Sequence, residues 1–370
     1  MSVVWADFRG GTSYREIYGR FSTDYGATFA ASDVKVNASG STATRDSFNV
    51  ELASSGSNVY VVYESFVSDR SRQVFFSRST NGGSSWSAPV QASSGTGSTY
   101  VAATPKVAAA GSDVYVVWRD NRSGGLDIFL RRSTNSGSSF TGGDVRLDVG
   151  DAAGSNSSFS PALAAQGSNV YVAWVDDRDM GSFDIWLNRS QDRGASWRAS
   201  ALQLDADPFS HDSLEPQVVA PASGEAVVAW VDYRSGFPDV LAARTTDAGN
   251  SFSTPTRLDT GSASGTSGSV DLSLDARGSL VVAAWADDRA GLLDIYANFS
   301  LDGGASWQPQ DYRLDSSPLG TSDSQRPRVY VSATAAHVVW VDHRLGSGCP
   351  GGSSSGMSCA NGDIFYRRMQ

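Results

Sequence analysis

Residues 281–307 read VVAAWADDRAGLLDIYANFSLDGGASW. An alternating apolar run ends at Trp285, a polar turn follows it, and a second alternating run begins at Asp294. Another tight turn, residues 300–307, closes the stretch. Period-two runs separated by glycine-bearing turns are typical of β-strands joined as hairpins.

This pattern recurs along the whole chain. The closing turn occurs six times, at residues 22–29, 79–86, 133–140, 190–197, 245–252 and 300–307. The apolar run occurs seven times, centred on Trp5, Tyr63, Trp118, Trp174, Trp230, Trp285 and Trp340. A repeat of about 55 residues with four strand-like runs matches the size of a propeller blade. We therefore expect an all-β, seven-bladed β-propeller with four-stranded blades, forming one domain over residues 1–370; six blades plus an extra hairpin is the alternative.

Each repeat is expected to contain four strands, named A to D in chain order. Strand A is expected to begin at a proline in four repeats, at positions 105, 161, 216 and 327. The residue after this position is mostly polar. We expect inter-blade ion pairs there, Glu51 with Lys106 and Asp271 with Arg328; the alternative is that Arg328 binds an anionic ligand.

Composition limits the classes of partner. The net charge of -10 argues against nucleic acid, because phosphate binding needs a basic surface. No apolar run approaches the roughly 18 residues of a membrane span, so no transmembrane segment is expected. We expect a monomer.

The two cysteines, Cys349 and Cys359, lie in one glycine-rich loop. A disulfide is the favoured interpretation, because other metal ligands are lacking nearby except His343. A disulfide indicates an oxidising compartment, so we expect an extracellular, periplasmic or cell-surface protein. Charged residues begin at Asp7 and no signal peptide is recognisable, so we expect a mature secreted chain with a new Met1.

The closing turn, Ser-x-Asp-x-Gly-x-x-Trp, resembles the Asp box, also called the bacterial neuraminidase repeat, of sialidase-like propellers. Two copies carry Asn81 or Asn135 in place of the aspartate. The resemblance implies that these turns join strands C and D on the face opposite the active site. It covers nearly the whole chain and concerns architecture rather than activity.

The catalytic motifs of sialidases are not matched. No Arg-Ile-Pro string occurs, and Tyr63 and Glu64, although adjacent, are expected to point to opposite faces of a strand. A Trp-x-Asp-x-Arg signature recurs in six repeats, so we interpret its arginines as structural, pairing with the aspartate that opens strand C or with turn carbonyls. No cofactor or metal is expected; calcium at Asp176-Asp177 or Asp287-Asp288 is the alternative.

Functional residues are expected where repeats differ, on the face built by the B–C and D–A loops. The candidate ligand-binding residues are Arg45, Asp46, Tyr63, Glu64, Phe209, His211, Glu215, Arg326, Arg328 and His343. If the chain is an enzyme, the catalytic candidates are His211, Asp212, Glu215 and Glu64.

Three functions remain open. We favour a secreted or cell-surface binding module for carbohydrate or another extracellular ligand, because no catalytic set is complete. The first alternative is a glycoside hydrolase, a sialidase-like exo-glycosidase, which needs paired carboxylates. The second is a scaffold or adhesion module of a longer surface protein. The fold alone does not discriminate among them.

Overall fold

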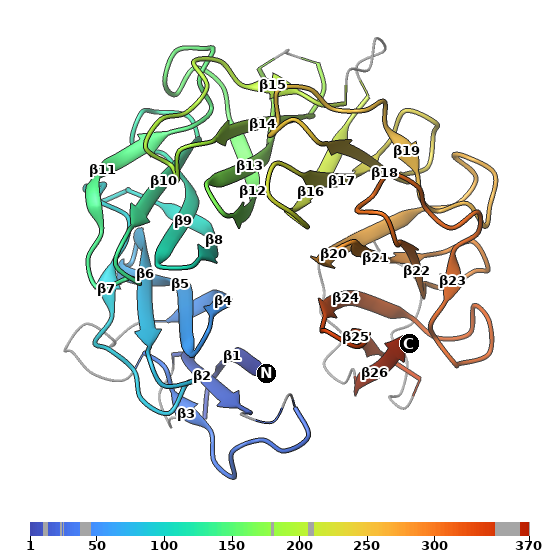
Figure 1. The fold of residues 1–370 in the computed structure, drawn as a ribbon, viewed down its shortest axis with the longest axis horizontal. Coiled ribbons are helices and arrows are strands. Elements are labelled where there is room, and N and C mark those ends of the chain that lie inside the picture. Colours follow the sequence, from blue (N-terminus) through green and yellow to red (C-terminus); the bar gives the residue numbers. More distant parts are fainter. Residues whose placement is uncertain are drawn as a thin grey trace. The chain divides into compact units, whose positions relative to one another are not determined.

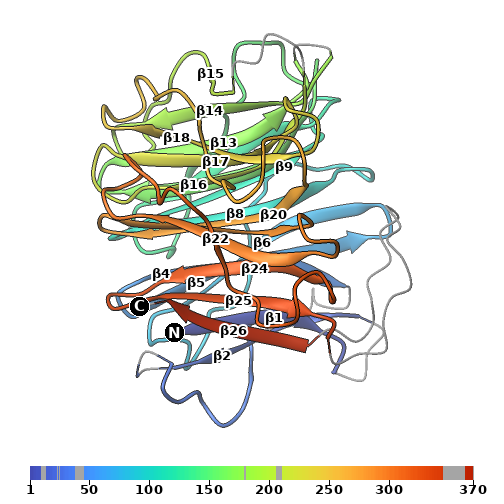
Figure 2. The ribbon, with the colours of Figure 1, turned by 90° about the vertical axis from the view of Figure 1, so that its right-hand side faces the viewer.

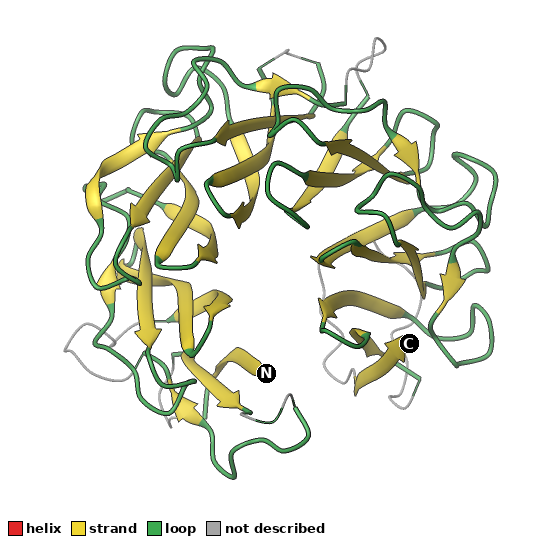
Figure 3. Ribbon diagram, in the orientation of Figure 1, coloured by secondary structure: helices red, strands yellow, loops and turns green. Residues whose placement is uncertain are grey.

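The computed structural model describes residues 1–9, 14–22, 24, 26–37, 46–178, 181–205, 211–344 and 363–369. These residues form 26 strands and no helix (Figure 3). The strands make seven antiparallel sheets in chain order, five of four strands and the first and last of three. The predicted seven-bladed β-propeller is confirmed, and the six-bladed alternative is wrong.

The chain divides into two compact units, residues 1–178 with 186–202 and residues 179–185 with 203–370. The strands are labelled in Figure 1. Blade 1 is β1 (Ser2–Asp7), β2 (Glu16–Phe21) and β3 (Val34–Lys35). Blade 2 is β4 (Ser47–Ser55), β5 (Asn58–Ser68), β6 (Ser71–Ser79) and β7 (Val90–Gln91). Blade 3 is β8 (Ala102–Ala110), β9 (Asp113–Asp120), β10 (Asp127–Ser133) and β11 (Thr141–Arg146). Blade 4 is β12 (Ser158–Gln166), β13 (Asn169–Asp176), β14 (Asp184–Ser190) and β15 (Leu202–Gln203).

The remaining three blades belong to the second unit. Blade 5 is β16 (Ser213–Val219), β17 (Ala226–Asp232), β18 (Asp239–Thr245) and β19 (Thr256–Arg257). Blade 6 is β20 (Ser269–Arg277), β21 (Leu280–Asp287), β22 (Asp294–Ser300) and β23 (Tyr312–Arg313). Blade 7 is β24 (Ser324–Val331), β25 (Ala336–Asp342) and β26 (Asp363–Met369).

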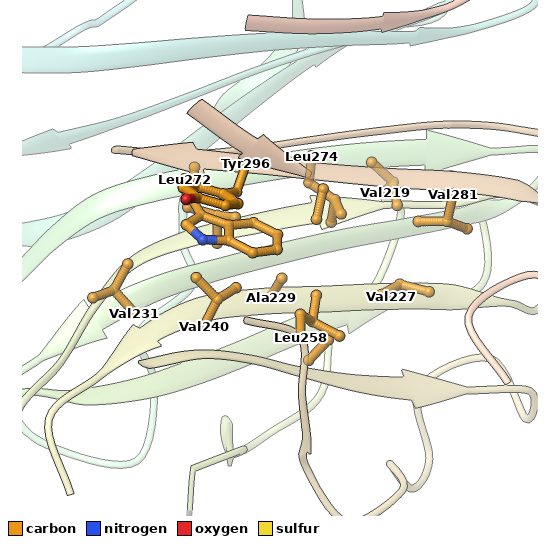
Figure 4. Packing of buried hydrophobic residues seen from close by; sticks show 13 residues of the cluster. Val219, Val227, Ala229, Val231, Val240, Leu258, Leu272, Leu274, Val281 and Tyr296 are labelled. Atoms are coloured by element: carbon orange, nitrogen blue, oxygen red, sulfur yellow. The ribbon is translucent and has the colours of Figure 1, made fainter. Parts of the chain in front are cut away.

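The hydrophobic core lies between successive blades of each unit. In the first unit β4 contacts β8 and β8 contacts β12; in the second, β16 contacts β20 and β20 contacts β24 (Figure 2). Figure 4 shows one such cluster, where Val231 and Leu258 of the fifth repeat face Leu272 and Tyr296 of blade 6. The repeat tryptophans are core residues as expected, with 0% exposure for Trp118, Trp174, Trp230 and Trp285.

Every strand A carries a bulge. The register of β8 on β9 shifts between Ala103 and Lys106, and the first bulge residue, Thr104, has φ of 50°. The same left-handed position is occupied by Asn49, Ser160, Glu215, Asp271 and Arg326. The prolines occupy the second bulge position, where no ladder N–H is needed. The strands therefore begin about three residues before the prolines, earlier than predicted.

The bulge corrects one predicted pairing. Lys106 does pair with Glu51 of the preceding blade. Asp271, however, is itself a bulge residue, and Ser273 takes the place equivalent to Lys106. The carboxylate of Asp271 accepts the backbone N–H of Arg326 at 3.0 Å, while Arg328 donates to the carbonyl of Pro327. The predicted Asp271–Arg328 pair is therefore wrong, because Asp271 corresponds to Arg326 in the repeat and lies two residues before the position that corresponds to Arg328.

The six closing turns share one set of hydrogen bonds. In residues 300–307 the Ser300 hydroxyl accepts the N–H of Gly304 at 2.7 Å, and Asp302 accepts the N–H of Ser306 at 2.8 Å. The hydroxyl and the N–H of Ser306 lower the pKa of Asp302 from its ordinary value. The carboxylate or amide thus caps the turn, as the sequence predicts.

The Trp-x-Asp-x-Arg arginines are structural, but their main partner differs from the prediction. The guanidinium of Arg178 pairs with Asp176, two residues earlier, at 2.6 Å, and the indole N–H of Trp174 donates to this same carboxylate at 2.8 Å. The guanidinium also lies over the Trp186 ring, with its Cζ 4.1 Å from the centroid. The expected pairing with the aspartate opening strand C is wrong, because the closer carboxylate of Asp176 binds the guanidinium instead. The other expected partners, turn carbonyls, are present, since Arg178 donates to the carbonyls of Asp148 and Val149.

Strand D leads into a buried aspartate in several repeats. Burial raises the pKa of Asp148 to about 7 and those of Asp205 and Asp259 to about 6. Each carboxylate lies beside the start of strand C; Asp205, for example, accepts the N–H of Ile185 at 2.9 Å. These aspartates connect the end of strand D to the start of strand C within a blade, and burying their carboxylates costs desolvation free energy.

Candidate functional site

Charged residues replace apolar ones at two repeat positions of the first unit. We compare the residue three positions before the strand-C partner of the strand-B aromatic. It is apolar in blades 3 to 6, Leu126, Phe183, Pro238 and Leu293, but is Arg15 in blade 1 and Arg72 in blade 2. The residue following the strand-B aromatic is alanine or valine in five blades, but is Glu64 in blade 2 and Arg119 in blade 3. We call Arg15, Glu64, Arg72 and Arg119 the arginine cluster.

Glu64 is the centre of this cluster and is fully buried. Its Oε2 accepts a hydrogen bond from Nη1 of Arg72 at 2.8 Å. Its Oε1 accepts the side-chain N–H of Asn49 and the backbone N–H of Thr104, both at 2.7 Å. The carboxylate is therefore satisfied on both oxygens, which fixes Arg72 in place. Tyr63 points away into the core, as strand alternation predicts.

Arg15 is held by Asp46. The guanidinium forms a two-pronged pair with this carboxylate, Nε to Oδ1 at 3.0 Å and Nη2 to Oδ2 at 2.6 Å. Asp46 also accepts the backbone N–H of Arg15 at 2.7 Å. The Asp46 hydrogen bonds raise the pKa of Arg15. This side chain is oriented before any ligand arrives.

Arg119 has no such partner. Its guanidinium makes no hydrogen bond or ion pair with any residue that the structure describes, and its Nε is buried without a partner. Burial lowers its pKa; the charge of Glu64 opposes this effect and that of Arg72 adds to it. A buried Nε without a hydrogen-bond partner is costly unless an anion or water completes its shell.

Phenylalanine rings surround the arginines. The Arg15 Cζ lies 4.7 Å from the Phe48 centroid, the Arg72 Cζ lies 5.8 Å from both Phe48 and Phe66, and the Arg119 Cζ lies 5.7 Å from Phe159. The Phe48 and Phe66 centroids are 5.7 Å apart. Rings at these distances stabilise the cations and lower the local dielectric, which strengthens an interaction with an anion. Chemically, the cluster can hold a carboxylate or sulfate beside an apolar surface.

The predicted site residues fall in both compact units. In the first unit Glu64 belongs to the arginine cluster, Asp46 pairs with Arg15 of that cluster, and Tyr63 is a core residue. In the second unit, His211 and His343 are half-buried and Arg326 and Arg328 are exposed. Arg45, Phe209, Cys349 and Cys359 lie outside the described residues, so the disulfide stays a prediction.

Asp212 and Glu215 have backbone partners. Asp212 accepts the N–H of Phe183 at 3.0 Å, just as Asp46 accepts that of Arg15, so this contact is shared between repeats. Glu215 accepts the N–H of Leu272 at 3.0 Å. Burial raises the pKa of Glu215, and the neighbouring Asp271 acts in the same direction.

Sequence reasoning missed Arg15, Arg72 and Arg119. The signal was nevertheless present, because an alignment of the repeats shows arginine at positions that are otherwise apolar. The recurring arginines were interpreted as structural, and the three arginines that do not recur were therefore not recognised as candidate site residues.

No group of three or more His, Cys, Asp or Glu that could hold a metal ion is found in the described ranges. In the same residues no helix is long and apolar enough to cross a membrane.

Comparisons with known proteins identify the fold. No protein-family model matches the chain, and no curated protein is similar to it. An ulvan lyase, described as a polysaccharide lyase, has a TM-score of 0.58 at 9% identity, covering 89% of this chain and 84% of its own. An α-L-arabinofuranosidase from Fusarium graminearum has a TM-score of 0.51 at 11% identity, covering 79% and 87%.

A Hadza microbial sialidase is also similar, with a TM-score of 0.48 at 16% identity over 88% of this chain and 71% of its own. This score is too low to carry an argument. The similar propellers thus include carbohydrate-active proteins, and identities this low show the fold alone.

Proposed function

We propose that this chain is a secreted or cell-surface Asp-box β-propeller that binds an acidic carbohydrate through the arginine cluster. The observation that carries the proposal is Arg119, a partly buried arginine whose buried Nε has no partner among the described residues, beside Arg72, which Glu64 holds in place. A uronate, sialate or sulfate group supplies the oxygens that match a guanidinium fork. Phe66 and Phe159 offer apolar surface to the C–H face of a sugar ring.

The proposal also explains why the cluster contains a buried carboxylate. Three arginines without an acid would repel one another, and Glu64 offsets part of that charge while it orients Arg72. Arg15 is likewise compensated by Asp46. Arg119 is therefore the residue whose charge the ligand neutralises.

A glycan array with matched neutral and acidic glycans tests this function. Arg119→Ala is expected to weaken binding of acidic glycans by roughly 10- to 100-fold, the equivalent of one charge-assisted hydrogen-bonding group. Arg119→Lys should restore part of the affinity. The control is Arg367→Gln, which removes the same charge from an exposed arginine of β26.

Two outcomes contradict the proposal. One is equal binding of neutral and acidic glycans by the wild-type protein. The other is unchanged binding by Arg119→Ala together with a loss in Arg326→Ala, which would transfer the site to the second unit.

A glycoside hydrolase is the second candidate, favoured by the raised pKa of Glu215 next to Asp271. A glycoside hydrolase needs a pair of carboxyl groups, and Glu215 and Asp271 are the neighbouring pair. Fluorogenic glycosides test it: hydrolysis that falls about 100-fold or more in Glu215→Gln supports catalysis, and hydrolysis unaffected by this change excludes Glu215.

A further inference from the structure

In blades 3, 5 and 6 an arginine of strand D lies beside two buried aspartates. In blade 3 the Nε of Arg146 is 3.2 Å from the carboxylate of Asp127 and 2.9 Å from that of Asp148. The equivalent sets are Asp239, Arg257 and Asp259 in blade 5 and Asp294, Arg313 and Asp315 in blade 6. Each guanidinium offsets part of the charge of two carboxylates that are almost completely buried.

Blade 4 keeps both aspartates but has Gln203 in place of the arginine. The two acids, Asp184 and Asp205, are 2% and 1% exposed. We call them the carboxylate pair. Because glutamine is neutral, the carboxylate pair has one positive charge fewer beside it than the pairs of blades 3, 5 and 6. All three residues belong to the second unit.

The hydrogen bonds of strand D establish this equivalence. The leucine after the position donates its N–H to a strand-C carbonyl in each of these blades: Leu147 to Ile128, Leu204 to Ile185, Leu258 to Val240 and Leu314 to Ile295. Gln203 directly precedes Leu204, so in β15 it stands where the other blades have arginine (Figure 1).

One oxygen of the carboxylate pair is buried without a partner. Oδ2 of Asp205 accepts the N–H of Ile185 at 2.9 Å, but its Oδ1 has no hydrogen-bond partner among the described residues. In blade 3 the Oδ1 of Asp148 likewise accepts no hydrogen bond, yet it lies 2.9 Å from Nε of Arg146 as an ion pair. An unpaired carboxylate oxygen in the interior is costly unless a cation or a proton satisfies it.

Arg234 of blade 5 does not replace the missing arginine. Its guanidinium donates to the backbone carbonyl of Asp205 at 2.9 Å. Arg178 makes the same contact with the carbonyl of Asp148 in blade 3, where Arg146 is present as well. This contact therefore recurs in the repeat and does not remove the charge difference of blade 4.

A proton satisfies the carboxylate pair only below neutral pH. Burial, reinforced by the charge of Asp184, raises the pKa of Asp205 to about 6 when no cation is bound. Above that pH both carboxylates are ionised in most molecules, and the pair then needs a cation from solution.

We propose that the carboxylate pair binds a calcium ion, which takes the place of the arginine guanidinium of blades 3, 5 and 6. Two carboxylates and the amide oxygen of Gln203 are hard oxygen donors, which calcium prefers. Calcium accepts backbone carbonyls and water as its remaining ligands, so two acids are sufficient. Its double charge offsets both carboxylates. The site shares no residue with the arginine cluster and is independent of the proposed glycan site.

Calorimetry and thermal unfolding of the full chain test the proposal. Wild-type protein that has been stripped with a chelator is expected to bind calcium. At a calcium concentration about 100 times the dissociation constant, its melting temperature should rise by about 3 °C or more over that of the stripped protein.

Gln203→Arg copies the residue of blades 3, 5 and 6 and is therefore compatible with the fold. Its guanidinium should occupy the site, so the variant should bind one calcium ion fewer per chain and, after stripping, melt above the stripped wild type. Gln91→Arg is the matched control, because it adds the same charge at the equivalent position of blade 2, where Gln73 and Ser93 replace the acids. It should bind calcium as the wild type does.

Asp184→Asn is a second variant, which removes one charge without adding bulk. It should weaken calcium binding about tenfold or more, because calcium affinity depends on the number of charged ligands. A wild-type protein that binds no calcium would overturn the proposal, as would calcium binding that Gln203→Arg and Asp184→Asn both leave unchanged. A melting temperature that depends on pH but not on calcium would overturn it in favour of a shared proton.

Discussion

The backbone N–H of Thr104 donates a hydrogen bond of 2.7 Å to Oε1 of Glu64, so a side chain of blade 2 anchors the first strand of blade 3. Thr104 is the left-handed bulge residue of β8, with φ of 50°. The carboxylate that organises the arginine cluster therefore also stabilises a strained backbone position. Binding and stability are coupled at this residue.

Replacement of Glu64 by glutamine tests this coupling. The amide can still accept the N–H of Thr104, but Arg72 loses its counter-charge. We expect a loss of about 3 kcal/mol in unfolding free energy, near the lower end for a broken buried pair. Urea denaturation measures it. Glu51→Gln is the control, because its pair with Lys106 is 39% and 33% exposed and should contribute only about 0–1 kcal/mol.

Trp285 is expected to be a core residue rather than a ligand contact. Its side chain has 0% exposure, and truncation leaves a large cavity beside Tyr296. Trp285→Ala should cost about 3–5 kcal/mol in unfolding free energy. Tyr312→Ala removes an aromatic ring that is 47% exposed and should cost far less. Thermal and urea unfolding distinguish the two; equal losses would contradict the assignment.

Gly137 of the closing turn has a matched control in Gly142 of β11, because both residues have φ of 71°. A Cβ at Gly137 would lie 2.6 Å from Phe76 of the preceding blade, whereas a Cβ at Gly142 would meet nothing within 4 Å. Both alanine variants should carry the strain of a left-handed residue. Gly137→Ala should lose a further 1–3 kcal/mol or so, because the turn must move off Phe76. Similar stabilities would show that the turn does not pack tightly.

Stability is expected to fall as pH rises from about 4 to about 7. The raised pKa values of Asp148, Asp205 and Asp259 mean that the folded state keeps protons that the unfolded state has already released. Their stabilising effect is complete below the unfolded pKa and is lost through the folded values of about 6 to 7. The turn aspartates have lowered pKa values, so their contribution is lost only as pH falls below about 4.

Denaturation at a series of pH values measures this dependence. Asp205→Asn, which keeps an acceptor for the N–H of Ile185, should flatten the profile between about pH 4 and pH 6. A profile that rises with pH over that range, or one that the variant does not change, would contradict the assignment.

The disulfide between Cys349 and Cys359 remains a prediction. In protein from an oxidising compartment, mass analysis should show alkylation of both thiols only after reduction. Thiols that react without reductant would remove the argument for an extracytoplasmic location.

The architecture could be predicted from the sequence because a repeated pattern carries the same information several times. The blade count and the burial of Trp118 and Trp174 rest on apolar alternation, which needs no knowledge of long-range contacts. The register at Asp271 could not be predicted correctly, because blade 6 lacks the proline that marks the bulge elsewhere. Only the strand pairing shows that Ser273 occupies the repeat position that Lys106 occupies in blade 3.

The candidate site was only partly predictable for a different reason. Glu64 departs visibly from the repeat and was identified, whereas Arg72 follows a turn whose longer β5–β6 hairpin obscures the alignment. The role proposed for Arg119 depends on the lack of a partner for its buried Nε. A sequence pattern does not show whether a side-chain donor has a partner. Such properties belong to the packed molecule.

At the first bulge position of strand A, the side chain can vary without a change in the backbone conformation. At the bulge the chain has accepted Asn49, Thr104, Ser160, Glu215, Asp271 and Arg326, which are neutral, acidic and basic, with φ between 46° and 58° in all six. Side-chain identity there is decoupled from backbone geometry. Evolution, or a designer with a combinatorial library, can therefore change the side chain at this position without changing the backbone, and where the residue is acidic, as at Glu215 and Asp271, it also bonds the backbone of the next blade.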